Sequence, residues 1–146
     1  MEETVVIRAM ELADAEAVAG LTVQLGYQRT AEEIARWIRE AGNSAERAAL
    51  VACAGASVVG WVEVSIERRL QSAPFALIGG LVVREGIRSR SIGRTLCKAA
   101  EDWARERGLE TLRVTSRSTR TDAHRFYLRD GYETVKMSMV FEKKLR

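Results

Sequence analysis

The sequence predicts an α+β fold, a mixed and mostly antiparallel sheet flanked by helices. Three observations predict it: short runs rich in β-branched residues, segments with apolar residues at helical spacing, and glycines where those segments end. Along the chain the predicted strands and helices have the order β-α-α-β-β-β-α-β-α-β, in which the last strand is one bent strand or a tight pair. A strand-helix-strand crossover is thus inserted into an otherwise antiparallel run.

The N-terminal half is predicted to hold one strand, two helices and a β-hairpin. β-branched residues favour the strand, and apolar residues at helical spacing favour helices that end at glycines. The second helix opens with the capping box Thr30-Ala31-Glu32-Glu33. In chain order we expect a strand at 4–8, helices at 14–26 and 30–42, and hairpin strands at 49–54 and 58–66.

The C-terminal half continues this alternation. Residues 75–83 form an apolar strand in which the pair Gly79-Gly80 predicts a bulge or a close backbone approach, against which a ligand could lie. The next helix, at 92–107, carries an apolar stripe made of Ile92, Leu96, Ala99, Ala100, Trp103 and Ala104. After it we expect a strand at 111–115, a short helix at 122–129 and a returning strand at 134–141.

Length and composition indicate a single domain over residues 1–146. The chain is 47% hydrophobic and 29% charged, which is typical of a globular protein. Its apolar runs are too short to cross a bilayer and its first residues are acidic, so we expect a cytoplasmic protein. Cys53 and Cys97 lack the spacing of a zinc site or a disulfide framework, so no metal is expected.

An arginine-rich turn joins the strand at 75–83 to the strongest helix. Within residues 84–94, small side chains would let an anion approach and arginines would add positive charge. Unpaired N–H groups at the start of a helix also attract phosphate. The turn therefore has the chemistry of a pyrophosphate site, and the alternative is that its arginines are simply solvated.

This turn and a second motif resemble the GNAT (GCN5-related N-acetyltransferase) superfamily. Arg88-Ser89-Arg90-Ser91-Ile92-Gly93 is similar to the family's Q/R-x-x-G-x-G/A signature, with Ser91 in place of the middle glycine. Residues 122–132 are similar to its A-x-x-F-Y-x-x-x-G-F/Y element, although Arg120 stands where the family usually has asparagine. Because the order of elements also agrees, the resemblance covers residues 4–144.

The resemblance implies an N-acetyltransferase that moves an acetyl group from acetyl-CoA to a primary amine by direct attack in a ternary complex. It places the coenzyme along the strand and the turn, at Leu81, Val82, Val83, Arg88, Ser89, Arg90, Ser91, Ile92, Gly93 and Arg94. The expected acceptor is a small-molecule or peptide amine. Membranes and nucleic acids are not expected partners, and a homodimer is compatible with the sequence.

Acetyl transfer calls for a base and an acid. An amine with a pKa of about 10.4 is almost wholly protonated at pH 7, and the leaving thiol has a pKa of about 8.5. The resemblance implies that Tyr127 is the acid. Glu63 is the candidate base, because strand alternation places Trp61, Glu63 and Ser65 on one face. The alternatives are a packing role for Tyr127 and a solvated position for Glu63.

Other chemically interesting side chains have structural interpretations. His124 is expected to be solvated or to cap its short helix, and Cys97 to pack within its helix rather than act as a nucleophile. Tyr27 and the helix at 30–42 resemble the variable acceptor wall of GNAT proteins. The tryptophans are expected in the core: Trp37, Trp61 and Trp103.

Two other functions are compatible with the sequence. The first is a basic nucleic-acid binder, because arginines recur at 84–98 and at positions 113, 117, 120 and 125 while the net charge is +3. No recognised nucleic-acid motif accompanies them, and such binding would depend steeply on salt. The second is a domain that binds coenzyme A without catalysis, as a sensor or scaffold, which the presence of Tyr127 disfavours.

Overall fold

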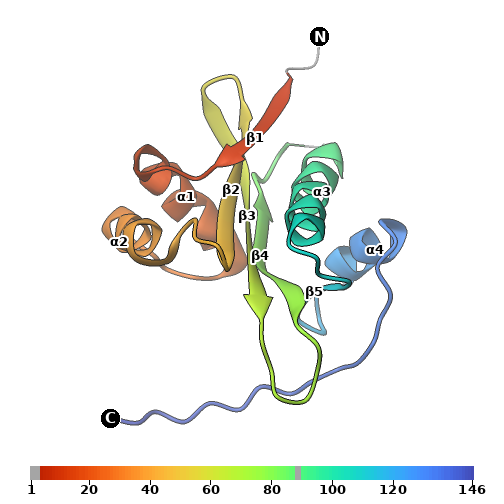
Figure 1. The fold of residues 1–146 in the computed structure, drawn as a ribbon. Coiled ribbons are helices and arrows are strands. Elements are labelled where there is room, and N and C mark those ends of the chain that lie inside the picture. The colour runs from red at the N-terminus through yellow and green to blue at the C-terminus, as the bar shows by residue number, and fades with distance from the viewer. Residues whose placement is uncertain (1–3, 88–89) are drawn as a thin grey trace. The chain divides into compact units, whose positions relative to one another are not determined.

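The computed structural model describes residues 4–87 and 90–146, which form two compact units, one up to Val114 and one from Thr115 to Arg146 (Figure 1). The first unit contains the whole sheet, and the second contains one helix and the C-terminal segment. A single domain over 1–146 stays a prediction. In the described ranges, no helix is both long enough and apolar enough to cross a membrane.

The first unit is built on a five-stranded sheet with the order β1-β2-β3-β4-β5. Its strands are β1 (Val5–Ala9), β2 (Arg47–Ala54), β3 (Ser57–Glu67), β4 (Phe75–Val83) and β5 (Leu112–Val114). The first four pair antiparallel, and β5 pairs parallel with β4. A parallel pair needs a crossover connection, which the helix between β4 and β5 supplies. The predicted mixed, mostly antiparallel sheet is confirmed.

Helices cover both faces of this sheet (Figure 1). Helices α1 (Ala15–Thr22) and α2 (Ala31–Ala41) lie on one face, and α3 (Arg90–Glu106) lies on the other. The segment predicted as one helix at 14–26 forms α1 between two 3₁₀ turns, at Leu12–Asp14 and Val23–Leu25. The predicted capping box of α2 is present, since the Glu33 N–H donates to Thr30 Oγ1 (3.1 Å) and the Thr30 N–H donates to Glu33 Oε1 (2.9 Å).

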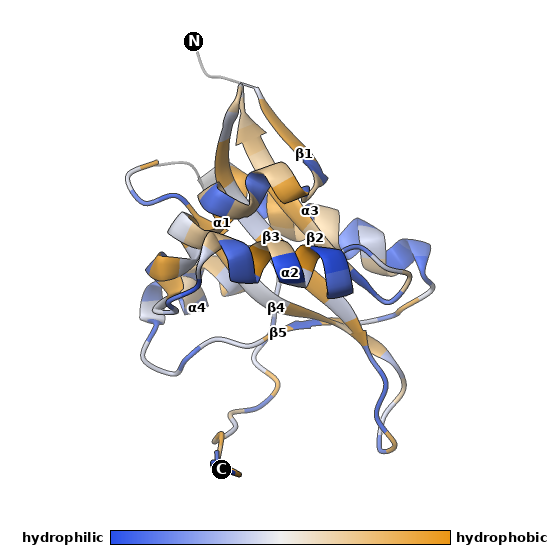
Figure 2. Cartoon of the chain, turned by 90° about the vertical axis from the view of Figure 1, so that its left-hand side faces the viewer, coloured by the Kyte–Doolittle hydropathy of each residue, from blue (hydrophilic) through white to orange (hydrophobic). Residues whose placement is uncertain are grey.

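The core is formed where the helices pack on the sheet. Figure 2 shows the strands β2 to β4 as largely apolar, whereas polar residues band the surface of α2. The apolar stripe of α3 is buried as predicted, apart from Ala99, which is half-buried. At Gly60 in β3, an added Cβ would lie 2.8 Å from Val82 O and 3.1 Å from Leu96 Cδ1. Helix α3 therefore packs very closely against β3 and β4.

An ion pair between the partly exposed Arg8 and the buried Asp14 ties β1 to the start of α1. Both Arg8 Nη atoms donate to the Asp14 carboxylate at 2.8 Å, and the Glu11 N–H donates to it at 2.7 Å. The hydrogen bond from Arg8 is the largest of the effects that lower the Asp14 pKa. Since Asp14 is buried, the pair fixes how α1 leaves the sheet.

The second unit contains α4 (Thr121–Arg129) and the segment that follows it. The Tyr127 ring packs edge-on against Phe126 (5.2 Å between centroids) and Tyr132 (5.6 Å). Gly131 ends the helix with φ 94°, and the Tyr132 N–H donates to Tyr127 O at 3.0 Å. These contacts hold the residues of the second predicted motif together.

The strand predicted at 134–141 is wrong. In the described parts of the chain, residues 132–146 join no strand ladder, and Figure 1 shows them as coil. A strand exists only where a neighbouring backbone supplies partners for its N–H and C=O groups. The alternation of apolar and polar residues predicted the strand, but alternation supplies no such partner.

Candidate active site

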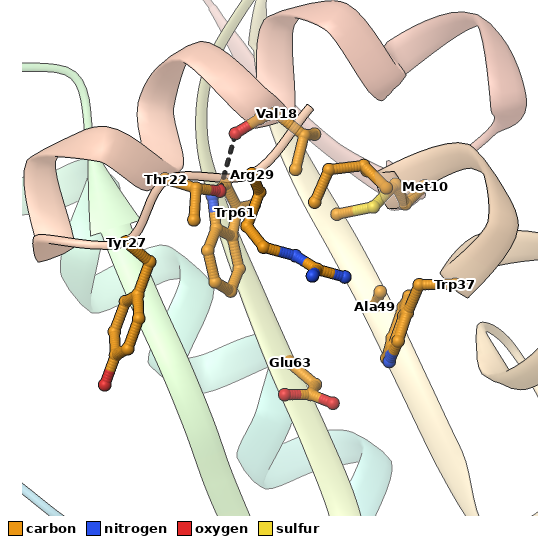
Figure 3. Close-up of a pocket in the computed structure, with 10 residues that line it drawn as sticks. Met10, Val18, Thr22, Tyr27, Arg29, Trp37, Ala49, Trp61 and Glu63 are labelled. Carbon is orange, nitrogen blue, oxygen red and sulfur yellow. Dashed lines mark hydrogen bonds between the residues drawn. The ribbon is translucent and has the colours of Figure 1, made fainter. Parts of the chain in front are cut away.

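A pocket of about 260 Å³ lies on the α1 and α2 face of the sheet (Figure 3). Its apolar wall is made by Met10, Val18, Ile34, Trp37, Ala49 and Trp61. Its polar side chains are Thr22, Tyr27, Arg29 and Glu63. A small apolar cavity with a few converging polar groups is the usual form of a small-molecule site.

Glu63 is the acidic side chain of this pocket. It lies in the middle of β3, two residues after Trp61, and both face the pocket as strand alternation predicted. Its side chain is 30% exposed, and Arg47 Nε lies 4.0 Å from Glu63 Oε2. Burial raises the pKa of Glu63 above its usual value, the charge of Glu67 adds to the rise, and the charge of Arg47 opposes it. A carboxylate with a raised pKa is a stronger base.

Two glycines in β4 make room for the side chains of β3. The ladder shifts register between Glu63 and Val64, where Gly80 and Ile78 are the partners and Gly79 is the extra residue, so the predicted bulge is confirmed. An added Cβ on Gly79 would lie 2.8 Å from Glu63 Oε1, and one on Gly80 would lie 2.7 Å from the Trp61 ring. The close approach predicted at this pair is thus made by β3 side chains.

Aromatic side chains and one arginine complete the pocket. Trp37 comes from α2 and Tyr27 from the loop before it, and their place in an acceptor wall stays a prediction. Figure 3 shows the Arg29 guanidinium reaching into the space between Trp61 and Trp37, above Glu63. Arg29 Nη1 also lies 3.2 Å from Glu33 Oε2. The sequence analysis missed Arg29, because only the path of the loop after Gly26 brings it to the pocket.

The tryptophans divide between pocket and core. Trp103 is buried as expected, with the Arg107 guanidinium 4.1 Å from its ring centroid. Trp37 and Trp61 are half-buried; they pack against the core and also line the pocket. The expectation that these two tryptophans lie wholly in the core was wrong. A side chain of this size can contact the core with one side and a cavity with the other.

The last part of β4 has an open edge. β5 pairs with β4 only at Ala76, Leu77 and Ile78, so in the described residues no strand borders 79–83 on that side. The coenzyme candidates Leu81, Val82 and Val83 lie in this part of β4, and their other edge pairs with β3. Free backbone groups at a strand edge can pair with an extended ligand.

The turn after β4 is held by Gln24 and Arg84. Gln24 Nε2 donates to Val83 O (2.8 Å), and Gln24 Oε1 accepts from the Glu85 N–H (2.9 Å). Arg84 Nη2 donates to Val58 O at 2.7 Å. Arg84 therefore fastens the start of the turn to β3.

The remaining residues of the turn that are predicted to bind the coenzyme lie at or just before the start of α3. Ser91 and Arg94 are exposed in its first turns, whereas Ile92 and Gly93 are buried and fix the helix on the sheet. Arg88 and Ser89 lie outside the described residues, as does the side chain of Arg90. In general, the start of a helix and nearby positive charge suit an anionic ligand.

Comparison with known proteins decides the family. The model of the acetyltransferase (GNAT) family matches residues 11–132. The chain belongs to the GNAT family. This confirms the resemblance carried by the turn at 88–94 and by the motif at 122–132.

Two curated relatives match part of this GNAT chain. An aminoalkylphosphonate N-acetyltransferase of Salmonella typhimurium is 39% identical over 77 residues, which are 52% of this chain and 50% of the relative. An uncharacterized N-acetyltransferase of Bacillus subtilis, YhdJ, is 40% identical over 68 residues, which are 47% and 44% of the two chains. The matched parts thus span about half the length of these relatives.

Solved structures share the fold over nearly the whole chain. A transcriptional regulator from Bacillus halodurans C-125 superposes with a TM-score of 0.85 at 25% identity, over 96% of this chain and 100% of that one. The aminoglycoside N-acetyltransferase AAC(6')-Iy, in complex with CoA, superposes with a TM-score of 0.86 at 20% identity, over 99% and 97%. These likenesses confirm the predicted fold class.

The structure also shows the contacts of three further side chains that the sequence analysis considered for catalysis. Cys97 is fully buried within α3, in agreement with its packing interpretation. His124 Nε2 lies 2.8 Å from Arg117 O, so the ring bridges α4 and the turn before it. Tyr127 is half-buried between Phe126 and Tyr132, and its role as the acid stays a prediction.

Proposed function

We propose that this GNAT chain transfers an acetyl group from acetyl-CoA to a primary amine by direct attack in a ternary complex. Membership of the family supports the reaction, and the CoA complex of AAC(6')-Iy supports the donor. The pantetheine arm would pair with the open edge of β4 at Leu81, Val82 and Val83. The pyrophosphate would lie at the turn 88–94, against the start of α3.

The observation that carries the proposal is the Glu63 carboxyl in the wall of an aromatic pocket, beside the bulge of β4. An ammonium group is attracted to both a carboxylate and aromatic faces, so the acceptor amine would enter toward Glu63, with Trp37 and Trp61 around its carbon atoms. Glu63 would then remove one proton. The raised pKa of Glu63 makes it better suited to this step than an ordinary surface carboxylate.

The neutral amine would attack the thioester carbonyl carbon. A C–N bond forms, the tetrahedral intermediate collapses and the C–S bond breaks, while the nitrogen loses its second proton to water. Coenzyme A and the N-acetyl product are then released. Tyr127 would donate its phenolic proton to the departing sulfur, as the motif at 122–132 implies. A thiol with a pKa of about 8.5 is a moderately good leaving group, so this acid would help the reaction less than the base.

The acceptor is proposed to be a small molecule that carries a primary amine. Aminoalkylphosphonates and aminoglycosides, from which two of the similar acetyltransferases take their names, are both polar small molecules with amino groups. The size of the pocket suits part of such a molecule. Arg29 would be available to an anionic group on the acceptor, such as a phosphonate.

Thermal denaturation with acetyl-CoA, followed by a thiol-release screen, tests the proposal. A ligand at 100 times its Kd stabilises the folded state by about 2.7 kcal/mol, so a clear rise in Tm is expected. The screen would compare aminoalkylphosphonates, aminoglycosides, polyamines, amino acids and peptides. Binding without amine-dependent thiol release would identify the sensor alternative. No change in Tm at saturating acetyl-CoA would overturn the proposal.

A further inference from the structure

The pocket on the α1 and α2 face holds two charged side chains of opposite sign. Among the described residues that line it, Glu63 is acidic and Arg29 is basic. They do not pair with each other: in the described structure Arg29 pairs with Glu33, and Glu63 lies beside Arg47. Figure 3 shows both charged groups turned into the same space. A molecule with one group of each sign can therefore satisfy both.

The Arg29–Glu33 pair is one that a ligand can replace. Its two side chains are 42% and 46% exposed, and ion pairs of this kind usually contribute about 1 kcal/mol or less. Glu33 Oε2 accepts from Arg29 Nη1, whereas Glu33 Oε1 accepts from the Thr30 N–H. Because the two oxygens have different partners, the capping box of α2 does not depend on Arg29.

The charges of this pocket disfavour an acceptor with several amino groups. Glu63 is the one carboxylate among the described side chains of the wall, so a second ammonium group would find no partner there and would be repelled by Arg29. The nearby carboxylates of Glu33 and Glu67 lie outside the wall and already pair with Arg29 and Arg69. An acidic group on the acceptor avoids this repulsion.

The size of the pocket also limits the acceptor. Its volume of about 260 Å³ lies below the roughly 300–1,000 Å³ of sites that enclose drug-sized ligands. A molecule of the size of an amino acid would fit with both of its charged ends inside. The charges and the volume thus point to the same kind of molecule.

We propose that the acceptor is a small zwitterion whose acidic group displaces Glu33 from Arg29. This inference rests on the proposed acetyl transfer, because it names the acceptor of the same site. The amino group would lie at Glu63, and the planar guanidinium of Arg29 would donate to two oxygens of a carboxylate or a phosphonate. Glu33 is then an internal competitor, which holds Arg29 until the acceptor binds and weakens the binding of every anionic acceptor.

Thiol-release kinetics with acetyl-CoA test the choice of acceptor on four probes: β-alanine, aminoethylphosphonate, β-alaninamide and diaminopropane. In all four, two carbon atoms separate the amine from a second group, which is a carboxylate, a phosphonate, a neutral amide or an aminomethyl cation. For the wild type, kcat/KM for at least one of the two acids should exceed that for the amide and the diamine by about tenfold, mainly through KM. The two acids distinguish a carboxylate acceptor from a phosphonate acceptor.

Arg29→Gln should reduce the acid-to-amide ratio of kcat/KM to near one, because the amide gains nothing from the guanidinium. Arg36→Gln is the matched control: Arg36 is an exposed arginine of α2 whose charge also acts on Glu33, but it does not line the pocket. Its ratio should equal that of the wild type. Thermal denaturation checks that each variant is folded.

Glu33→Gln should raise the acid-to-amide ratio by about threefold, because it removes the competitor for Arg29. Glutamine serves in a capping box as glutamate does, so α2 should keep its start. Glu32→Gln is the control, since it removes a neighbouring negative charge from the same first turn of α2. A purely structural role of Arg29 would not give a gain in Glu33→Gln that Glu32→Gln lacks.

The outcomes separate this inference from the proposed function. If the wild type uses the amide or the diamine as well as the acids, the inference is overturned and acetyl transfer stands. The inference is also overturned if Arg29→Gln keeps the preference for acids, or if Glu33→Gln lowers it. Thiol release with other amines but with none of the four probes would overturn the inference alone. No thiol release with any amine would overturn both.

Discussion

The pocket on the α1 and α2 face and the candidate coenzyme site at residues 81–94 are built differently. The pocket is defined by side chains, namely Trp37, Trp61, Arg29 and Glu63. The candidate coenzyme site is defined mainly by backbone, namely the open edge of β4, the turn held by Gln24 and the first turn of α3. We infer that coenzyme binding and acceptor turnover can be altered separately by substitutions in the two regions.

Glu63→Gln gives the largest expected effect. The change keeps the size of the side chain and removes the base, so kcat/KM for the amine should fall by about 100-fold while the Kd for acetyl-CoA stays unchanged. Steady-state kinetics and calorimetric titration measure the two quantities. The control is Glu67→Gln, because Glu67 is also on β3 and is also 30% exposed beside an arginine, but does not line the pocket. Equal losses in both variants would contradict the assignment.

Tyr127→Phe should lower kcat by about tenfold, with little change in acetyl-CoA binding. The effect is smaller because the leaving thiolate is fairly stable without help. Tyr132→Phe, which removes the hydroxyl of the neighbouring ring, should keep nearly all activity. Wild-type turnover in Tyr127→Phe would reject the acid role and leave Tyr127 as a packing residue.

Arg94→Ala should weaken acetyl-CoA binding by about threefold and leave kcat nearly unchanged, because a single exposed charge contributes up to about 1 kcal/mol. The loss should shrink as salt rises, since salt screens exposed charges. Lys98→Ala, one turn further along α3, is the control, because it removes an exposed positive charge of the same helix at a position further from the helix start. If both variants bind acetyl-CoA like the wild type, the helix start does not hold the pyrophosphate.

The smallest expected effect is on stability. Burial raises the Glu63 pKa in the folded state above its ordinary value of 4.5, so the charged carboxylate destabilises the fold at pH values above the folded pKa. Glu63→Gln carries no such charge and should have a slightly higher Tm at pH 7. The difference should shrink as the pH falls and should disappear near about pH 3, well below the unfolded pKa, where the carboxyl is protonated in both states. A lower Tm for Glu63→Gln at pH 7 would show that the charged carboxylate stabilises the folded state, which contradicts this prediction.

The two regions also differ in how far the sequence alone predicts them. Backbone features follow from local patterns: the bulge at Gly79-Gly80, the capping box at Thr30 and the turn before α3 each need particular residues at fixed spacing. Alternation along β3 likewise placed Glu63 and Trp61 on one face. These features were predicted because the residues that define each of them are neighbours in the chain.

Features that depend on distant segments were missed. Arg29 lines the pocket because of the path that the chain takes between Gly26 and α2, and no pattern around Arg29 signals this. Trp37 and Trp61 gave the same apolar signal as core residues. The segment 134–141 carries a strand pattern, but the sequence does not state which edge, or which molecule, supplies its partner.

The most direct test of the central claim is the pH dependence of kcat/KM for one amine acceptor, measured with the wild type, Glu63→Gln and Glu67→Gln. The wild type and Glu67→Gln should lose activity as the pH falls through a raised carboxyl pKa, above 4.5. Glu63→Gln should have low activity without that step. The same step at the same pH in all three enzymes would contradict the assignment of Glu63 as the base of this pocket.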